Sequence, residues 1–150
     1  MSEVRASIEI QAPPEKVYDL ALDPSRLDEW VTIHRTVNRA DKGAPKAGFE
    51  MDQTLHLRGA NFKVHWMLTE ASRPDHATWE GRGPAHSYAR TTYRLTPMDG
   101  DATRFEYENE FKPPGGVIGR AASRVIVGGV PQREADRSLK RLKALLEQSQ

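Results

Sequence analysis

The apolar pattern near the end of the chain predicts one amphipathic helix over residues 132–148. Ala135, Leu139, Leu142 and Leu146 recur at steps of four, three and four, which places their side chains along one side of a helix. Most of the other positions carry charged side chains. Because a helix with one apolar side must bury it against a second layer, the rest of the chain is expected to supply that layer.

Residues 31–112 alternate instead between apolar and polar side chains, which is typical of antiparallel strands with one dry face. A first strand is predicted at residues 4–10. Two short helices are expected after it, one beginning near Pro14 and one over residues 23–29, where Asp23 and the prolines provide start signals. The next strand is expected to begin at Trp30. The C-terminal helix would then lie across a single antiparallel sheet.

One predicted hairpin has its turn at residues 59–60. That turn pairs Leu57 with Phe62 and Gln53 with Trp66, and all of these side chains share one face of the sheet. The charged residues of both strands fall on the opposite face. The register and the apolar face therefore agree with each other.

The last hairpin is expected to have a three-residue loop at 99–101, in which the central glycine takes a positive φ. This loop pairs Thr91 with Asn109. The same alternation turns Tyr88 outward, which is unusual for a tyrosine, and a bulge at residues 83–87 would change the register there. Beyond this hairpin, a helix is expected from about residue 118, with a kink at 128–131.

Length, charge and composition restrict the function. We expect residues 1–150 to form one domain, large enough to bury roughly 70% of its unfolded surface. The formal net charge is +1, so nucleic acid is not an expected partner. There is no cysteine, and no motif suggests a metal or any other cofactor. No signal peptide or long apolar span is recognisable, which favours a cytoplasmic protein without integral membrane association.

Polar residues on the dry face are the most informative candidates for a site. Gln53, Thr91 and Asn109 fall there, and a buried side-chain amide without a partner costs about 1–3 kcal/mol. Two interpretations stay open. The three side chains bond to one another, to tyrosine hydroxyls or to water, or they orient a ligand within an apolar pocket.

The aromatic and histidine side chains allow the same two kinds of interpretation. Trp30, Trp66 and Trp79 lie on or near the inward set, and they either fill a core or contact a planar ligand. His34 and Tyr93 are the candidates for proton transfer. A structural role for His34 is the simpler interpretation, because no motif positions it for catalysis.

Two segments, IEIQAPPEKVYDLALDPSRLDEW and READRSLKRLKALLE, together with the order of strand, two helices, six strands and long helix, resemble the START/SRPBCC superfamily. This superfamily has the helix-grip fold of the birch-pollen allergen and includes the polyketide cyclase/dehydrase group. Within it, DPSRLDEWVTIHR and the tryptophan of KVHWML resemble small actinobacterial proteins, some of them classed as toxins of toxin–antitoxin pairs. The resemblance implies an α+β fold in which a curved seven-stranded antiparallel sheet, two short helices and the long C-terminal helix enclose a cavity.

Three functional hypotheses follow from these patterns and from the resemblance. The first is binding of a hydrophobic or amphipathic small molecule, lipid-like or polyketide-like, between the sheet and the C-terminal helix. The second is a polyketide cyclase or dehydratase that acts through pocket Tyr and His side chains without a metal or nucleotide. The third is a toxin-like protein that acts through its surface on an unknown protein partner. The residues predicted to contact a ligand are Trp30, His34, Gln53, Trp66, Trp79, Thr91, Tyr93, Tyr107, Asn109, Leu139 and Leu142.

Overall fold

The computed structural model describes residues 2–57, 59–112 and 130–148. In these residues, seven strands form one antiparallel sheet in the order β1-β7-β6-β5-β4-β3-β2. The predicted helix-grip class is confirmed. The helix expected from residue 118, and all of its kink except residues 130 and 131, lie outside the described residues. The strands are β1 (Ser2–Ile10), β2 (His34–Ala40), β3 (Glu50–Leu57), β4 (Ala60–Ser72), β5 (His76–Arg82), β6 (Tyr88–Met98) and β7 (Ala102–Lys112). The helices are α1 (Pro14–Leu22), η1 (Pro24–Arg26), α2 (Leu27–Trp30), η2 (Pro84–His86) and α4 (Val130–Gln148).

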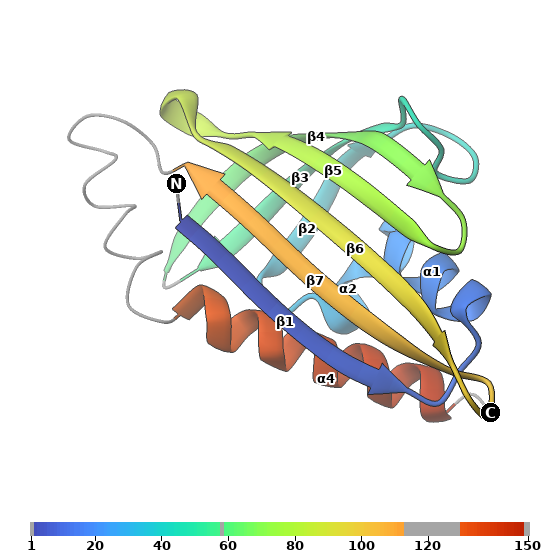
Figure 1. Ribbon diagram of the computed structural model, residues 1–150. Helices are drawn as coiled ribbons and strands as arrows, with labels where there is room; N and C mark the ends of the chain where they lie inside the picture. Colours follow the sequence, from blue (N-terminus) through green and yellow to red (C-terminus); the bar gives the residue numbers. More distant parts are fainter. Residues whose placement is uncertain (1, 58, 113–129, 149–150) are drawn as a thin grey trace.

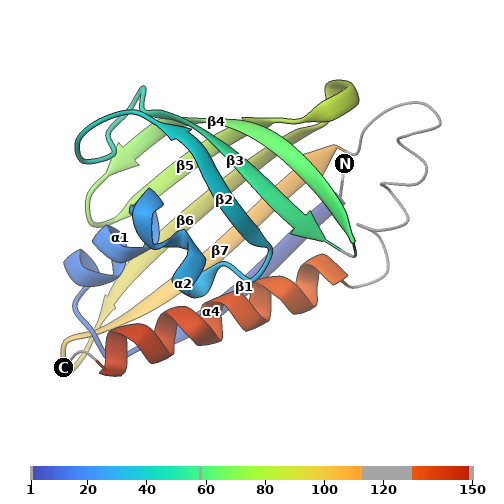
Figure 2. The same ribbon diagram turned by 180° about the vertical axis from the view of Figure 1, so that it is seen from behind.

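Helix α4 lies across the open side of the curved sheet and runs alongside the edge strand β1 (Figures 1 and 2). Lys143 Nζ donates to the carbonyl of Glu9 at 2.7 Å, and Gln132 Nε2 donates to the carbonyl of Arg5 at 2.8 Å. These bonds occupy backbone acceptors of an edge strand that would otherwise be free to pair with another chain. The helix therefore also protects one edge of the sheet.

The other edge is connected to α4 through the segment between α2 and β2. The backbone N–H of Thr32 donates to Ser138 Oγ at 3.0 Å, and the Thr32 hydroxyl also contacts the Glu134 carboxylate. Helix α4 thus links the region beside β1 to the region before β2, which are the two ends of the strand order. The space between sheet and helix is enclosed on both sides as a result.

The apolar side of α4 faces the sheet as its spacing predicts. Ala135, Leu139, Leu142 and Leu146 are all buried, and Leu142 is fully excluded from solvent. Burying a leucine side chain contributes about 1.5–3 kcal/mol. Packing against the sheet, rather than helix propensity, therefore holds α4 in place.

The beginning of the chain follows the expected order with one correction. Asp23 accepts a hydrogen bond from the backbone N–H of Ser25 at 2.9 Å, which confirms it as a helix cap. The expected strand start at Trp30 is wrong, because Trp30 ends α2 and β2 begins only at His34. The N–H of Val31 bonds to the carbonyl of Leu27, so the chain is still completing a helical turn where alternation suggested a strand.

The register of the β3–β4 hairpin differs by two residues from the predicted one. Leu57 pairs with Ala60, and Gln53 pairs with Val64 instead of Trp66. Gly59 has φ +80° and takes the second place of the turn, where a glycine relieves the steric cost of positive φ. A shift of two residues keeps every side chain on its expected face.

The β6–β7 hairpin is confirmed in detail. Thr91 pairs with Asn109, the loop covers residues 99–101, and Gly100 has φ +76°. The irregularity suspected at 83–87 is the short helix η2. Tyr88 faces outward, and its hydroxyl donates to the Glu80 carboxylate on the outer face.

Candidate functional site

A cavity of about 240 Å³ lies between the sheet and α4. This volume is just below the range of about 300–1,000 Å³ that is common for small-molecule pockets. Most of its lining is apolar. Among the residues that line it, Pro84 and Lys112 are exposed, so the cavity extends to the protein surface at that end.

The cavity occupies only one end of the space under the sheet. Leu55, Leu57, Phe62 and Val64 line this end and are only partly buried, although they face inward. At the other end, the interior is filled by side chains with no solvent exposure. These are Ile10, Val17, Leu68, Phe105 and Leu142.

Gln53 is held in the cavity wall by two hydrogen bonds of fixed direction. The indole Nε1–H of Trp66 donates to Gln53 Oε1 at 2.9 Å, and an indole nitrogen is only ever a donor. The Gln53 amide nitrogen, 2.8 Å from His34 Nδ1, must therefore donate to that ring nitrogen. His34 is consequently neutral with its proton on Nε2.

The environment of His34 agrees with this assignment. Burial lowers the pKa of His34, and the nearby carboxylate of Asp28 only partly opposes the shift. A protonated ring would present a second N–H to the Gln53 amide and would lose the hydrogen bond. His34 thus positions Gln53 and does not line the cavity.

Thr91, Asn109 and Tyr107 form a second internally bonded group. Thr91 Oγ1 donates to Asn109 Oδ1 at 3.2 Å. Burial raises the pKa of Tyr107 to about 12, and hydrogen bonds with Asn109 and Thr91 oppose the rise. Internal bonding, one of the two interpretations left open by the sequence, is thus present for Gln53, Thr91 and Asn109, and the orientation of a ligand by these side chains stays a prediction.

Trp30 and Tyr93 are neighbouring donors in the cavity wall that lack such partners. Trp30 Nε1 is the only buried side-chain nitrogen or oxygen without a hydrogen bond among the described residues. The hydroxyl oxygen of Tyr93 is not one of these fully buried atoms, but it too has no hydrogen bond within the described part of the chain, and burial of the side chain shifts the pKa of Tyr93 far above its ordinary value. Their rings meet edge to face with centroids 6.3 Å apart.

Gly81 makes room for Trp66 in this wall. It pairs with Trp66 across β4 and β5, and a Cβ atom at Gly81 would lie 2.7 Å from the indole ring and 2.8 Å from Val64. Distances this short do not occur in real packing. The indole ring can therefore pack against β5 at this position only because Gly81 has no side chain.

Most of the predicted site residues do line the cavity, but two do not. His34 lies behind Gln53, and Leu142 belongs to the filled end. The sequence patterns did not identify Glu134 and Ser138 as lining residues. The residues that were both predicted and found in the lining are Trp30, Gln53, Trp66, Trp79, Thr91, Tyr93, Tyr107, Asn109 and Leu139. Their roles as ligand contacts stay predictions.

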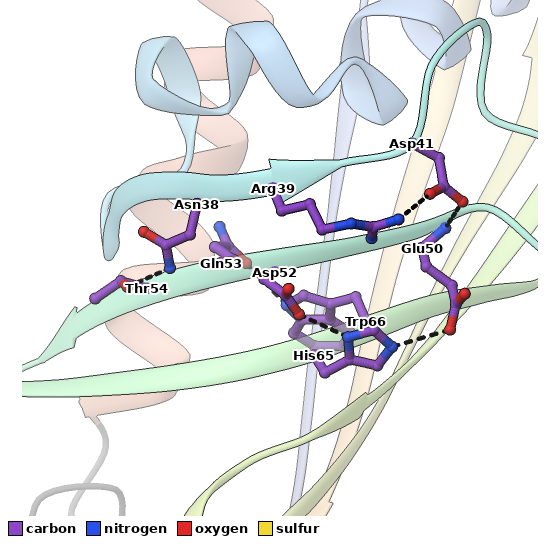
Figure 3. Close-up of polar contacts among 9 residues, drawn as sticks. All are labelled: Asn38, Arg39, Asp41, Glu50, Asp52, Gln53, Thr54, His65 and Trp66. Atoms are coloured by element: carbon purple, nitrogen blue, oxygen red, sulfur yellow. Dashed lines mark hydrogen bonds and ion pairs between the residues drawn. The ribbon is translucent and has the colours of Figure 1, made fainter.

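The outer face of the sheet carries a separate cluster of charged side chains (Figure 3). His65 lies between two carboxylates, with Nδ1 2.6 Å from Asp52 and Nε2 3.0 Å from Glu50. Only an imidazolium can donate from both nitrogens, and these carboxylates raise the pKa of His65. Elsewhere on this face, the carboxylates of Glu3, Glu108 and Glu110 lie close together, but Arg5 pairs with the first two.

Sheet, helix and cavity together define a START-like helix-grip domain with room for a small molecule. Residues 1–147 match the family described as polyketide cyclase / dehydrase and lipid transport. The chain belongs to this family. Membership supports a ligand-binding role in general.

Solved structures with the same fold and one distant relative are similar to this chain. A protein of Thermus thermophilus, TTHA0849, is 20% identical with a TM-score of 0.76, and the match covers 99% of each chain. A START superfamily protein of Mycobacterium smegmatis is 15% identical with a TM-score of 0.71, again over 99% of each chain. These two show the fold alone. A protein named Toxin Rv0910, from Mycobacterium tuberculosis, is 22% identical over 99 residues, which are 66% of this chain and 69% of that protein.

None of the helices in ranges 2–57, 59–112 and 130–148 is both long and apolar enough to cross a bilayer.

Proposed function

We propose that this protein binds a small, largely apolar molecule in the cavity between the sheet and α4. The observation that carries the proposal is the cavity itself, about 240 Å³ of space in an interior that is otherwise filled. Protein interiors normally pack as densely as organic crystals. A persistent space with a mostly apolar lining and a few fixed polar groups is typical of ligand sites.

The described part of the surface does not offer a comparable apolar site. Among the described residues, Met67 and Met98 are the only large hydrophobic side chains that are exposed. A protein that acts through an apolar docking surface would be expected to expose a contiguous patch. The toxin-like hypothesis therefore stays a prediction that rests on resemblance, and so does the expected cytoplasmic location.

The cyclase hypothesis also stays a prediction. Its two candidate residues differ in position, since Tyr93 lines the cavity whereas His34 stands behind Gln53. No arginine is found among the described residues of the cavity wall. Ligand binding needs none of these groups to move a proton, so it is the function that the site supports with the fewest assumptions.

Native mass spectrometry of the protein purified from its own source tests the proposal. Gentle ionisation should show an added mass that denaturation releases. In a Val64→Trp variant, the larger ring should fill the cavity and remove that mass. Lys63→Trp is the matched control, because Lys63 is the exposed neighbour of Val64 in β4 and faces outward.

Two results would contradict the proposal. One is a parent protein that carries no added mass, even after incubation with lipid extract. The other is equal retention of the mass by the Val64 and Lys63 variants, since the molecule would then lie outside the cavity.

A further inference from the structure

The two donors without partners in the cavity wall indicate which ligand chemistry the site accepts. Trp30 is 2% exposed and lines the cavity, and its indole N–H has no acceptor among the described residues. A buried donor without a partner costs about 1–3 kcal/mol, and native proteins rarely retain one. The missing partner of Trp30 must be an acceptor, because the indole nitrogen has no lone pair to offer.

Tyr93 provides a second donor beside the first. Tyr93 comes from β6 and Trp30 from the end of α2, yet their ring centroids are only 6.3 Å apart. Tyr93 also contacts Phe105 and Tyr107, with centroids 5.3 Å and 6.1 Å away, so its ring is fixed by neighbours on both sides. Burial keeps the hydroxyl protonated at any physiological pH, and it therefore remains able to donate.

Two other groups of polar side chains in the cavity wall are already engaged. Gln53 bonds to Trp66 and His34, and Thr91 bonds to Asn109. A ligand would have to break these bonds in order to use their donors. A ligand can accept hydrogen bonds from Trp30 and Tyr93 without breaking an existing hydrogen bond.

The charges around the cavity favour a neutral ligand. The charged residues in its described lining are Glu134 and Lys112. The Glu134 carboxylate is occupied by the Thr32 hydroxyl and by Arg137, whose Nη1 is 3.3 Å away. Lys112 is exposed at the end of β7. A carboxylate buried beside Trp30 would therefore lack a cation to offset its desolvation.

We infer that the site binds a small uncharged molecule whose carbonyl oxygen accepts hydrogen bonds from Trp30 and Tyr93, while its apolar remainder packs against Leu55, Phe62 and Val64. This inference rests on the proposed function and narrows it to one ligand class. Neutral ketones, esters and amides belong to this class. Ionised fatty acids and plain hydrocarbons do not.

Three naphthalene probes of similar shape separate these classes. They are 2-acetylnaphthalene, which has a ketone, 2-isopropenylnaphthalene, in which a methylene group replaces the ketone oxygen, and 2-naphthoate, which is charged. Calorimetric titration of the full chain gives the affinity of each. We expect the ketone to bind more tightly than the charged probe.

The test compares the ketone-to-alkene affinity ratio between variants. Trp30→Phe and Tyr93→Phe each remove one donor and keep a ring, and each should lower the ratio about 3- to 10-fold. Tyr107→Phe is the matched control, because its hydroxyl also faces this region but is engaged by Asn109 and Thr91. Its ratio should stay within about twofold of the parent value.

The outcomes distinguish the two proposals. An unchanged ratio in both test variants, or an equal fall in Tyr107→Phe, would overturn the inference and leave ligand binding intact. Tighter binding of 2-naphthoate than of the ketone would also overturn it. Failure of the parent protein to bind any probe would count against the proposed function itself, and the inference would fall with it. If Trp30→Phe does not fold, Tyr93→Phe alone decides.

Discussion

The two ends of the space between the sheet and α4 use the same kinds of residue but pack them differently. At the filled end, Leu142 of α4 belongs to the same buried cluster as Phe105 and Ile10, and none of the three is exposed to solvent. At the hollow end, Leu139 of the same helix lines the cavity together with Val64 and Leu57, and these two side chains remain partly exposed. One helix therefore provides both a structural core and the wall of a candidate site.

A layer of aromatic rings separates the two ends. Tyr93 contacts Phe105 on the filled side and Trp30 and Tyr107 on the cavity side. Rings in edge-to-face or tilted contact contribute about 0.5–1.5 kcal/mol per pair beyond their buried area. Because of this layer, the cavity at one end does not disturb the dense packing at the other end. Stability and binding should accordingly respond to different substitutions.

Shortening a leucine at each end gives the largest expected contrast. Leu142→Ala should lower the free energy of unfolding by about 3–5 kcal/mol, because it opens a void in a filled region. Leu139→Ala should cost about 1–3 kcal/mol, since its side chain already borders empty space and loses fewer contacts. Urea unfolding of the two variants measures the difference. Equal losses would show that the two ends are packed alike.

Adding one methyl group at Gly81 should disturb the hollow end specifically. Gly81→Ala places a Cβ against the Trp66 ring and should destabilise the protein by about 2–3 kcal/mol through overpacking. It should also weaken ligand binding, because the displaced ring enters the cavity. Gly100→Asn is the control, since Gly100 lies in an exposed turn with open space around it and asparagine tolerates its positive φ. A Gly81→Ala variant with unchanged stability and affinity would contradict this role of the glycine.

Removing the Gln53 amide should have a smaller effect on stability. Gln53→Met leaves Trp66 Nε1 and His34 Nδ1 without their partner and should cost about 1–2 kcal/mol. Thr91→Val is the comparison, because it removes the 3.2 Å bond to Asn109 and the bond with the Tyr107 hydroxyl but leaves Asn109 and Tyr107 bonded to each other, so it should cost less. Thermal unfolding of both variants shows which substitution lowers the stability more. A Gln53→Met variant as stable as the parent would mean that the hydrogen-bonded chain contributes nothing.

The smallest expected effects are changes of stability with pH that come from two histidines, one on each face of the sheet. Their pKa values are shifted in opposite directions. The pKa of His34 is lowered from 6.5 by burial, so the unfolded chain binds its proton more readily and this contribution to stability is lost as pH falls below 6.5. The pKa of His65 is raised from 6.5, first by its bond to Asp52 and then by Glu50. Its contribution is present below 6.5 and is lost as pH rises through the folded-state pKa.

NMR titration of the histidine ring protons checks both directions. His34 should show a midpoint below 6.5 and His65 a midpoint above it. In an Asp52→Asn variant, only the His65 midpoint should move down. Midpoints in the reverse order would refute the assigned hydrogen-bond chain around Gln53.

The fold could be predicted largely from the sequence, whereas the site could be predicted only in part. Period-two alternation identified the faces of β3, β4, β6 and β7 even where the register was off by two, because such a shift keeps the faces unchanged. The position of His34 could not be obtained in this way. Register shifts in β2 put His34 and Val37, three residues apart, opposite Leu55 and Gln53, which lie on one face of β3.

The missing hydrogen-bond partner of Trp30 Nε1 could not be predicted from the alternating pattern either. Alternation placed Trp30 in a strand, but it ends a helical turn, and its hydrogen bonding depends on contacts from α2, β6 and α4 that no local pattern encodes. The size of the cavity could not be predicted from the sequence for a similar reason. Leu139 and Leu142 have the same spacing and chemistry, and only the facing strands determine which of them borders empty space.

The central claim is that the hollow end, and not the filled end, receives a ligand. Methyl NMR spectra of the protein titrated with 2-acetylnaphthalene test it most directly. Saturable shifts confined to Leu55, Leu57, Val64 and Leu139, with the methyl signals of Leu68, Leu95, Leu142 and Leu146 unchanged, are the predicted result. Shifts centred on the second group, or none that saturate, would contradict it.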